Sequence, residues 1–574
     1  MPRDDTGNDR ERSSGKIPNE QRLVQLGQDV DRRSSGTSTH RVRSRRRTWI
    51  RRSVIAFALV VVLLVGAVVG DYYYLGSLIH HQKVNSLQTA GASENILLIG
   101  STTRCGLKVQ NIAYGLCSQG VTGVNSDIDM ILHLDPSTGS VSLMSIPRDL
   151  FIPNARIEGA NKIDAALYQG PSQLVAAIEE DFAIPINHYV ELNFDTFASV
   201  VNALGGVYMD FPVPIFDQES GLNIERPGCY LLDGVKALEL VRARHLQIQN
   251  TPSNHNPRSW PQEALSDLAR IRRTHEFLRV LAAKVAARGL SNPITDQSIA
   301  TAVLPSLTVD NRFSESSMVG LARTFAHTNI AKVLQYTFPV IQVETGSLLY
   351  QGYYYGDVVF PVQPTGVNSI NQILGVAAGM NSFTDQPLPA PSSFPLSIEN
   401  GTGVASQAAV VASELTAKGF KIKSTSDVTP VGPVSETVVW YGGPKPPANG
   451  NWTSPAQADA QAVLAQLQGP AILGYDPANV TAGSLVTVQT GTDLSVKAKV
   501  STTKTTTTKP TTKTTKTTSV TTTTIYDPPG VKTNPQFSVP SAVSSALEPW
   551  DPRACNAANT GPAVVATTTT TKSK

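Results

Sequence analysis

An uninterrupted apolar run near the N-terminus places the strongest constraint on this chain. Residues 53–70, SVIAFALVVVLLVGAVVG, carry no charged side chain. As a helix rising about 1.5 Å per residue they would extend about 27 Å, enough to cross the hydrocarbon core of a bilayer. Seven arginines lie in residues 41–52 directly before the run, and arginines mark the cytoplasmic side of a span. We therefore expect one transmembrane helix over residues 48–75, with a cytoplasmic N-terminus and the later domains outside the cell membrane.

A cleaved signal peptide is the alternative interpretation of this run. Such a peptide has a short basic start and a small-residue cleavage site. Here residues 1–52 precede the apolar run, and no clear A-x-A site follows it. We therefore expect an uncleaved anchor. The arginine run would also suit nucleic acid, but its place beside a span favours topology and anionic lipid, so we expect no nucleic-acid partner.

The chain has 574 residues, too many for one ordinary core, and its composition changes several times. Residues 500–524 are nearly all Thr and Lys, a composition that forms no core. We predict a disordered basic cytoplasmic segment (1–47), the transmembrane helix (48–75), a stalk (76–92), a first outer domain (93–383), a Pro-rich linker (384–394), a second outer domain (395–492) and a disordered Thr/Lys-rich and Pro-rich tail (493–574).

The first outer domain alternates strand-like and helix-like segments. ENILLIG, DMILHLD and SVSLMSIP are continuous apolar runs typical of buried strands. SQLVAAIEEDF, DTFASVVNALGG, GVKALELVRARH and EALSDLARIRRTHEFLRVLAAKVAARG place apolar residues at helical spacing. This pattern predicts an α/β domain. The second outer domain shows strand patterns around two amphipathic helices, which predicts a small α+β unit.

All four cysteines lie on the proposed outer side of the membrane. Cys105 and Cys117 lie in one Gly-rich loop and would close it as a disulfide, which in an oxidising compartment adds roughly 3 kcal/mol. Their spacing does not indicate zinc, because no Cys-x-x-Cys or paired His accompanies them. The sequence leaves the pairing of Cys229 with Cys555 open.

Residues 144–153, MSIPRDLFIP, place an Arg-Asp pair directly after an apolar run. Pro147 stops the run, and Leu150 resumes the apolar pattern after Arg148 and Asp149. One interpretation is a surface turn with a solvated ion pair, which contributes little. The other is an anion site at a strand end, because open sheets bind ligands there.

Arginines recur in three places in the first outer domain. They are Arg148, then Arg242 with Arg244, then Arg270 with Arg272 and Arg273. On a helix, Arg270, Arg273 and Thr274 would share a face, while Arg272 points elsewhere. A solvated basic helix face is the plainer interpretation of the third group. Several guanidinium groups together also suit a pyrophosphate, because their planar forks match phosphate oxygens.

Asp127 and Asp129 precede a predicted strand, and the alternation of a strand puts both on one face. Paired carboxylates near phosphate-binding arginines suit Mg²⁺, which prefers carboxylate and substrate phosphate oxygens. An ordinary turn with acids at a strand start is the alternative.

These stretches together resemble the LytR-CpsA-Psr family of cell-wall glycopolymer transferases. The resemblance runs over residues 94–280 and rests on ENILLIGS, NSDIDMILHLDPSTGSVSLMSIPRDLFI, NKIDAALYQG, PINHYVELNFDTFASVVNALGGVYMDFPVPI, LLDGVKALELVRARH and SDLARIRRTHEFL. It implies an α-β-α domain with a central mixed sheet. The second outer domain, with its ENGTG turn, is similar to the LytR C-terminal domain.

The resemblance also implies a reaction and a set of site residues. A peptidoglycan sugar hydroxyl would attack the glycan-linked phosphate of a polyprenyl-pyrophosphate carrier, and an apolar cavity would take the lipid. The implied catalytic residues are Asp127, Arg148, Arg242, Arg244 and Arg270. The implied substrate-binding residues are Arg104, Asp149, Lys162, Arg273 and Thr274. Mg²⁺ is the implied cofactor, held by Asp127 and, as a hypothesis, by Asp129.

Three positions depart from the family's pattern. The family commonly has Asp, Arg and Gln where this chain has Thr102, Asn125 and Thr274. The loss of a carboxylate at Thr102 is the reason to consider Asp129 as its replacement. Two alternatives to transfer therefore stay open: a protein that binds lipid-linked glycan or wall polymer without transfer, and a polyprenyl-pyrophosphate hydrolase.

Overall fold

The computed structural model describes the domains that follow the predicted membrane anchor. The described residues are 74–89, 91–105, 116–120, 122–288, 301, 304–325, 328–342, 348–428, 434–443, 455–498, 547–556 and 564–565. The predicted cytoplasmic segment (1–47), nearly all of the predicted transmembrane helix (48–75) and most of the predicted tail lie outside them. No helix within the described part is both long and apolar enough to cross a bilayer.

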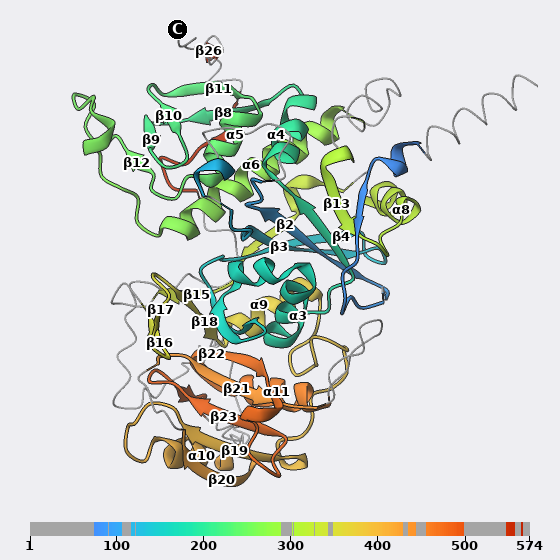
Figure 1. Cartoon of the computed structure of the whole chain (residues 1–574), viewed down its shortest axis with the longest axis vertical. Coiled ribbons are helices and arrows are strands. Elements are labelled where there is room, and N and C mark those ends of the chain that lie inside the picture. Colours follow the sequence, from blue (N-terminus) through green and yellow to red (C-terminus); the bar gives the residue numbers. More distant parts are fainter. Residues whose placement is uncertain are drawn as a thin grey trace, which may run out of the picture. The chain divides into compact units, whose positions relative to one another are not determined.

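A mixed sheet of seven strands is the central layer of the first outer domain (Figure 1). The strand order is β1–β13–β7–β2–β3–β4–β14. β2 is antiparallel to β3 and parallel to β7, and β14 is parallel to β4. The strands are β1 (His80–Gln82), β2 (Glu94–Ser101), β3 (Ser126–Asp135), β4 (Ser140–Ile146), β7 (His188–Leu192), β13 (Leu307–Asp310) and β14 (Leu334–Thr337). The predicted α/β fold with a central mixed sheet is confirmed.

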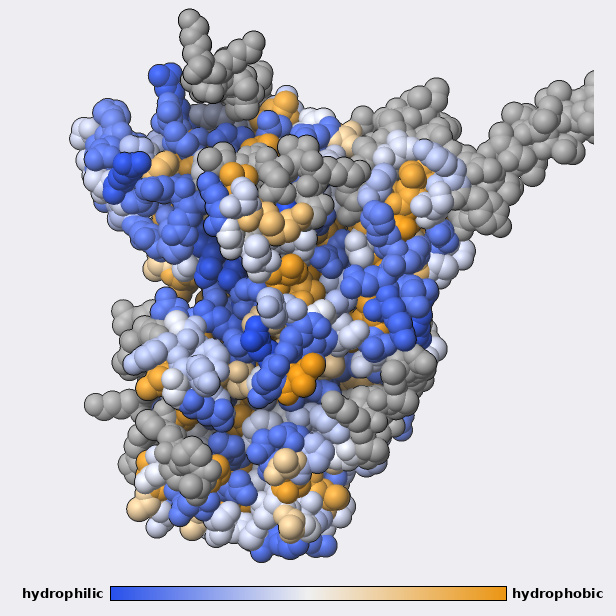
Figure 2. Space-filling view, in the orientation of Figure 1, coloured by the Kyte–Doolittle hydropathy of each residue, from blue (hydrophilic) through white to orange (hydrophobic). Residues whose placement is uncertain are grey.

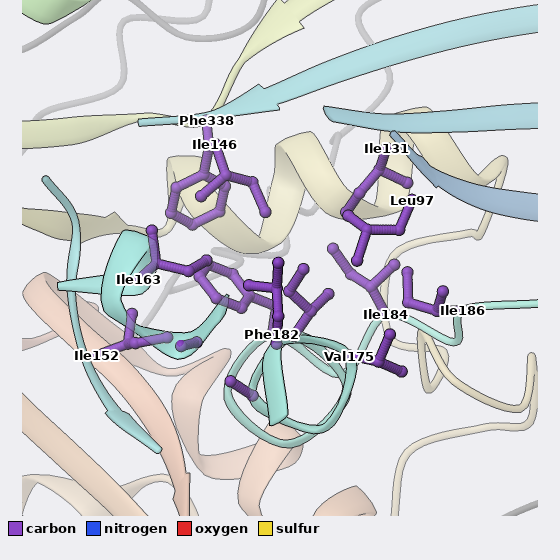
Figure 3. Packing of buried hydrophobic residues seen from close by; sticks show 14 of the residues in the cluster. Leu97, Ile131, Ile146, Ile152, Ile163, Val175, Phe182, Ile184, Ile186 and Phe338 are labelled. Carbon is purple, nitrogen blue, oxygen red and sulfur yellow. The ribbon is translucent and has the colours of Figure 1, made fainter. Parts of the chain in front are cut away.

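The main core lies between this sheet and helix α3 (Pro171–Phe182) (Figure 3). Leu97 and Ile131 reach it from the neighbouring strands β2 and β3, and Val175 and Phe182 reach it from α3. Strands buried on both faces carry nearly continuous apolar runs, which is why ENILLIGS shows no polar alternation. This core fixes the strand ends from which the polar side chains of the site project.

Helices α4 (Phe194–Ala203), α5 (Gly234–Arg242) and α6 (Ser266–Arg288) form a second core with two small sheets. One sheet has the order β25–β8–β11–β26, and the other has the order β10–β9–β12. Their strands are β8 (Val207–Phe211), β9 (Ile215–Asp217), β10 (Leu222–Ile224), β11 (Gly228–Leu232), β12 (Gln247–Ile248), β25 (Arg553–Ala554) and β26 (Val564–Val565). Buried Phe194, Leu240 and Phe277 belong to this core, one from each helix.

Residues 76–92 do not form the predicted stalk. β1 pairs in parallel with β13 at the edge of the seven-stranded sheet, and Val84 and Leu87 are buried in the main core. An edge strand of three residues is too short to produce a readable alternation, which explains why the sequence did not indicate it.

The second sheet crosses the predicted boundary between the two outer domains. Its order is β15–β18–β22–β21–β23–β19–β20, with β24 paired to β22. β15 (Val340–Gln342) and β18 (Val359–Gln363) precede the predicted linker, whereas β19 (Pro395–Asn400), β20 (Lys421–Asp427), β21 (Thr437–Tyr441), β22 (Leu467–Tyr475), β23 (Val486–Thr490) and β24 (Ser495–Val496) follow it. Helices α10 (Gln407–Ala417) and α11 (Pro455–Leu464) pack on this sheet.

Hydrogen bonds also join the two predicted domains. Asn154 binds the backbone of Tyr475 twice, through its Nδ2 to the carbonyl and through its Oδ1 to the amide, both at 2.8 Å. The Tyr441 hydroxyl donates to the carbonyl of Glu180 at 2.9 Å. Residues 384–394 therefore connect parts of one folded unit.

The other helices and strands of the described residues are β5 (Phe151–Arg156), β6 (Gly159–Lys162), α8 (Glu315–Phe325), β16 (Leu349–Tyr350), β17 (Tyr353–Tyr354) and α9 (Thr365–Leu374).

The predicted disordered tail (493–574) is wrong for residues 493–498, where β24 pairs with β22. It is also wrong for residues 547–556, which we call the returning segment. β25, within this segment, pairs with β8, and Cys555 is bonded to Cys229. Cys105 and Cys117 form the second disulfide, with a Cα–Cα distance of 5.1 Å. Composition had indicated disorder because the Thr/Lys-rich stretch dominates the last part of the chain.

Apolar side chains on the visible face occur in small groups among hydrophilic ones (Figure 2). Large exposed apolar residues include Tyr353 and Tyr354, which are 71% and 76% exposed in the β16–β17 hairpin. Scattered exposed apolar side chains are normal on protein surfaces. This face therefore does not by itself single out a docking site.

Gly234, at the start of α5, lies against the backbone of α4 and allows a test of this packing. A Cβ at Gly234 would collide with the backbone of Ala198. We expect Gly234→Ala to lower the free energy of unfolding by about 1–3 kcal/mol through overpacking, measured as a lower Tm by circular dichroism. The matched control is Gly320→Ala in α8, where an added Cβ meets nothing within 4 Å and helix propensity adds up to about 1 kcal/mol. Equal Tm values for the two variants would contradict the packing described.

Candidate functional site

A cavity of about 490 Å³ lies between the seven-stranded sheet and helices α4, α5 and α6. Most of its wall is apolar, and the apolar lining residues are Leu98, Ile99, Ile128, Met130, Leu192, Phe194, Phe197, Val200, Val201, Leu238, Val241, Leu278 and Leu281. Its charged lining residues are Arg104, Asp127, Arg148, Glu219, Arg242, Arg244 and Arg270. The described lining thus combines a long apolar wall with an excess of positive charge.

The Pro147–Arg148–Asp149 turn brings a guanidinium group into this cavity from the end of β4. The amide of Leu150 donates to the carbonyl of Pro147 at 3.1 Å, which closes the turn. The amide of Val359 donates to the carbonyl of Asp149 at 3.0 Å and holds the turn from outside. The Arg-Asp pair therefore belongs to a fixed strand end and not to a solvated surface turn.

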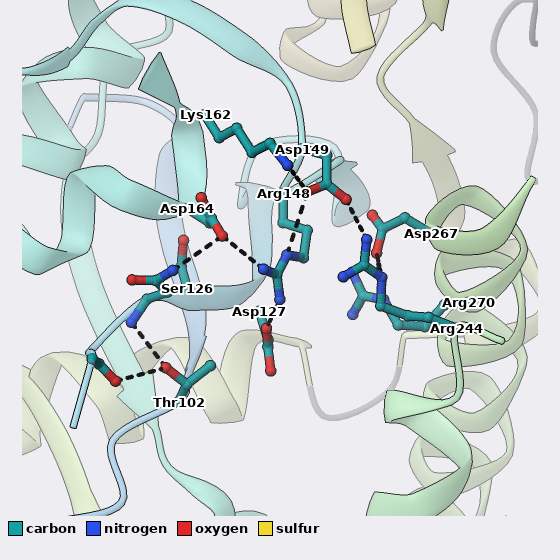
Figure 4. Close-up of polar contacts among 12 residues, drawn as sticks. Thr102, Ser126, Asp127, Arg148, Asp149, Lys162, Asp164, Arg244, Asp267 and Arg270 are labelled. Atoms are coloured by element: carbon teal, nitrogen blue, oxygen red, sulfur yellow. Dashed lines mark hydrogen bonds and ion pairs between the residues drawn. The ribbon is translucent and has the colours of Figure 1, made fainter. Parts of the chain in front are cut away.

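Three carboxylates surround Arg148 (Figure 4). Its Nη1 donates to Asp127, its Nη2 donates to Asp164 at 2.8 Å, and its Nε lies 3.8 Å from Asp149. Burial alone would lower the pKa of Arg148, but these carboxylates raise it above its usual value. The guanidinium is thus permanently charged and held in one orientation.

A chain of ion pairs with alternating charge leads from Asp149 to α6 (Figure 4). Asp149 accepts from Lys162 at 3.0 Å and from Arg244 at 2.5 Å. Asp267 accepts from Arg270 at 2.8 Å, and its Oδ1 lies 3.4 Å from Arg244 Nε. Burial disfavours the ionised form of Asp267, yet the adjacent Arg270 and Arg244 hold its pKa below the usual value. Ion pairs that share partners in this way preorganise the guanidinium groups before an anion arrives.

Arg104 and Arg242 approach the same aromatic ring from the loop after β2 and from the end of α5. Their guanidinium carbons lie 5.6 Å and 4.8 Å from the centre of the Phe194 ring. Partial burial, together with the positive charge of Arg242, lowers the pKa of Arg104. Two guanidinium groups beside one ring make the electrostatic potential of this part of the wall positive, which favours an anionic ligand.

The structure brings most predicted site residues together. The cavity is lined by Arg104, Asp127, Arg148, Arg242, Arg244, Arg270 and Thr274. Asp149 and Lys162 do not line it, but they form the ion pairs that position Arg148 and Arg244. The departures from the family's pattern, Thr102 and Asn125, also lie in the lining, as does Thr274.

Arg273 does not face the cavity, contrary to the prediction. Its side chain is fully buried and pairs with Glu263, while Thr274 lines the cavity beside Arg270 and donates to its carbonyl at 2.9 Å. Residues four apart on a helix are more nearly aligned than residues three apart. The deciding factor is that Glu263 lies on the side of Arg273, which the sequence spacing did not reveal.

Asp129 also lies elsewhere than predicted. Ile128 and Met130 line the cavity, whereas Asp129 is 1% exposed on the opposite face of β3 and accepts from Ser126 at 3.0 Å. The register of β2 and β3 shifts between Gly100 and Ser101, which breaks the alternation that would have grouped Asp127 with Asp129. Burial raises the pKa of Asp129 to about 8, so this carboxyl is mostly neutral at pH 7.

Two functional carboxylates were missed by sequence reasoning. Asp164 bridges Arg148 and Asn125, and burial raises its pKa to about 6 despite the positive charge of Arg148. Asp267 pairs with two cavity arginines. The three-residue spacing of Asp267 and Arg270 on one helix was a usable signal for the second, but nothing in the sequence links Asp164 to Arg148.

The side chains at the cavity would hold a magnesium ion only together with oxygen atoms of a bound substrate. Asp127 and Glu219 are the carboxylates among the described lining residues, and Asp127 is the one that contacts Arg148. Asp129 is unsuitable because it is mostly neutral and lies on the other face of β3. Among the described residues no three His, Cys, Asp or Glu side chains are grouped to hold a metal ion. Magnesium is commonly held by one or two carboxylates with phosphate oxygens and water, so Asp127 with a pyrophosphate would suffice.

Two family models match the chain. The LytR_cpsA_psr family matches residues 74–359, and the family described as LytR cell envelope-related transcriptional attenuator matches residues 393–494. The first match begins shortly before β1 and ends at the first residue of β18, so it includes every strand of the seven-stranded sheet.

Several curated relatives are named as cell-wall proteins. The probable cell wall biosynthesis protein LcpB of Corynebacterium glutamicum is 36% identical over 205 residues, which are 35% of this chain and 44% of the relative. The polyisoprenyl-teichoic acid–peptidoglycan teichoic acid transferase TagU of Oceanobacillus iheyensis is 28% identical over 211 residues, 35% of this chain and 60% of the relative. The chain thus spans about half the length of these relatives. A solved LytR-Csp2A-Psr enzyme from Actinomyces oris is 23% identical, with a TM-score of 0.38 over 46% of this chain and 87% of that one.

The buried carboxyl of Asp129 generates a pH prediction. Because the folded protein holds this proton more tightly than the unfolded chain, its contribution to stability is lost as pH rises from about 4 to about 8. Asp129→Asn cannot ionise and removes this slope. We expect the variant to be more stable than the wild type at pH 8, on the order of 3–5 kcal/mol at about 1.4 kcal/mol per pKa unit, with a smaller difference at pH 5.

Urea unfolding at both pH values measures this difference, and Mg²⁺ affinity should be unchanged in the variant. The control is Asp476→Asn, a turn residue outside the cavity. An Asp129→Asn variant with the wild-type pH dependence, or with weakened Mg²⁺ binding, would contradict the neutral, non-ligating carboxyl described here.

Proposed function

Because this chain belongs to the LytR-CpsA-Psr family, we propose that it transfers a glycopolymer from a polyprenyl-pyrophosphate carrier to peptidoglycan, leaving a phosphodiester link. The observation that supports this most is the composition of the cavity wall, in which five arginines accompany a mostly apolar lining. A pyrophosphate carries several negative charges, and a polyprenyl chain has no polar atoms. Few other ligands combine both properties in one molecule.

The arginines bind and orient the pyrophosphate in this proposal. Arg148 and Arg244 are each held in place by carboxylates, so the protein, and not the ligand, sets the direction of their remaining N–H groups. Preorganised donors stabilise charge that develops on the leaving phosphate without reorganising during the reaction. Arg104 and Arg242, which share the Phe194 ring, would hold the second phosphate.

The transfer itself exchanges one phosphorus–oxygen bond for another. The hydroxyl oxygen of the acceptor sugar bonds to the glycan-linked phosphorus, the bond from that phosphorus to the bridging oxygen breaks, and polyprenyl phosphate leaves. The hydroxyl proton passes to solvent. Asp127 would hold Mg²⁺ beside the phosphates, and a metal there neutralises charge on the leaving oxygens. The apolar wall excludes water from the lipid side of the bond.

We also propose that a helix over residues 48–75 anchors the protein in the cell membrane, with both outer domains facing the cell wall. The charge-free run and the arginines before it support this orientation. The two disulfides support it independently, because disulfides persist mainly outside the cytoplasm. An anchor at this position would keep the cavity near a carrier that itself resides in the membrane.

Replacement of Arg148 by lysine tests the proposed phosphate site. Lysine keeps the charge but loses the planar fork that contacts Asp127 and Asp164. We expect Arg148→Lys to reduce kcat/KM for transfer by at least about 100-fold, equal to about 2.7 kcal/mol of transition-state stabilisation. The control is Arg258→Lys, at an exposed position outside the cavity. Comparable activity of the two variants would contradict a role for the fork.

Reconstitution tests the reaction. The full chain in detergent is mixed with a polyprenyl-pyrophosphate oligosaccharide and uncrosslinked peptidoglycan, with Mg²⁺ or with chelator, and the acceptor is examined by mass spectrometry. We expect acceptor that carries glycan phosphate, formed with Mg²⁺ and lost with chelator and in Arg148→Lys. Tight binding of the lipid without product would favour a binding protein, and glycan phosphate released to water would favour a hydrolase.

A further inference from the structure

The returning segment is bound to the face of α6 that points away from the cavity. Asp551 is fully buried there, and its Oδ2 accepts from Arg272 Nε at 2.5 Å. Trp550 Nε1 donates to Glu263 at 2.9 Å, and the amide of Ala554 donates to Glu276 at 3.1 Å. Residues near the end of the chain therefore contribute buried polar partners to the first outer domain.

These contacts form one buried ion-pair network, which we call the α6 network: Glu263, Arg272, Arg273 and Asp551. Glu263 pairs with both arginines, and Asp551 lies 2.5 Å from Arg272 and 3.9 Å from Arg273. The side chains of all four are at most 5% exposed. Two positive charges are thus matched by two negative charges, one of which comes from the returning segment.

The α6 network reaches the phosphate-binding side through the backbone. Arg273 Nη2 donates to the carbonyl of Ala243 at 2.7 Å, and Ala243 is the residue between Arg242 and Arg244. The amide of Glu263 donates to the carbonyl of Leu246 at 2.7 Å. Asp551 helps to neutralise the guanidinium of Arg273, and this guanidinium holds residues 242–244, from which Arg242 and Arg244 project into the cavity.

Helix α6 itself connects the two sides. Arg270 and Thr274 line the cavity from one face of the helix, and Arg272 and Arg273 carry the α6 network on the other. If the negative charge of Asp551 is removed, the network keeps one uncompensated buried positive charge, which is strongly unfavourable. The simplest relief is movement of Arg272 or Arg273 toward water, and movement of Arg273 releases the carbonyl of Ala243.

Two further bonds hold the returning segment in place. Cys555 is joined to Cys229 of β11, directly before α5, and β25 pairs with β8 through Arg553 opposite Asp210. The segment is therefore attached on the α5 side by a disulfide and on the α6 side by ion pairs. Neither attachment touches the cavity.

We propose that Asp551 is a positioning residue, through which the returning segment fixes Arg242, Arg244 and Arg270 for pyrophosphate binding. The effect on pyrophosphate binding rests on the proposed function, but the role of Asp551 in holding Arg273 and the segment around Ala243 does not. Asp551 contacts no substrate atom, since it lies behind α6. It acts through Arg273 and the carbonyl of Ala243, and it defines a part of the site that begins beyond both family-matched regions.

The test compares Asp551→Asn with Glu548→Gln in the full chain. Both changes replace an acid by its amide within the returning segment, but Glu548 forms no ion pair among the described residues. We expect Asp551→Asn to bind inorganic pyrophosphate at least tenfold more weakly by calorimetry, and to raise KM for the lipid substrate more than it lowers kcat. Amide exchange of residues 242–246 should be faster, and Asp551→Glu should restore part of the affinity.

The outcomes separate this inference from the proposed function. Wild-type exchange of residues 242–246 and wild-type pyrophosphate affinity in Asp551→Asn would overturn the positioning role, whatever the enzyme transfers. A wild-type chain that transfers nothing would overturn the proposed function, while the exchange rates still decide the positioning role. If Asp551→Asn does not fold, Trp550→Phe removes only the indole donor to Glu263. A smaller increase in the amide exchange rate of residues 242–246 is then required, and wild-type exchange in this variant would overturn the positioning role.

Discussion

The carboxylates around the arginines determine where the positive charge of this site points. Arg148 is held by Asp127 and Asp164, and Arg244 is held by Asp149 and Asp267. Free arginine side chains would extend into water and would have to be ordered by the ligand at an entropic cost. Here that ordering is achieved when the protein folds, and the sheet and helices that supply the carboxylates are the framework on which the cavity depends.

Local sequence patterns placed some site residues, whereas distant partners and strand register decided the positions of others. For Arg148 the sequence left a solvated surface turn and an anion site open, and the structure decides only that the residue lines the cavity and is paired with carboxylates. Arg273 was placed wrongly because helical spacing gives the face of a side chain but not the position of its partner, and Glu263 and Asp551 come from distant segments. Asp129 was placed wrongly because a register shift beside Gly100 is invisible in a strand pattern.

Fold prediction succeeded where periodicity was long and failed where an element was short or its pairing distant. The α/β pattern of the first outer domain was readable from its helices and buried strands. The boundary near residue 384 was not, because β18 and β22 pair across it and the pairing of Gln363 with Gly469 leaves no local trace. A proline-rich stretch marks an interruption of regular structure, and it does not by itself mark the end of a folded unit.

The returning segment has a consequence for the order in which this protein is made. A ribosome synthesises Cys229 and the arginines of the cavity long before it reaches Asp551, and Cys555 follows Cys229 by 326 residues. The first outer domain therefore completes its buried charge balance only when Asp551, which follows both family-matched regions, has emerged. A premature stop codon after residue 498 would leave both family-matched regions intact. It would still remove Asp551, one of the two carboxylates of the α6 network. The codons for residues 547–556, which follow both family-matched regions, therefore contribute to the folding of the first outer domain.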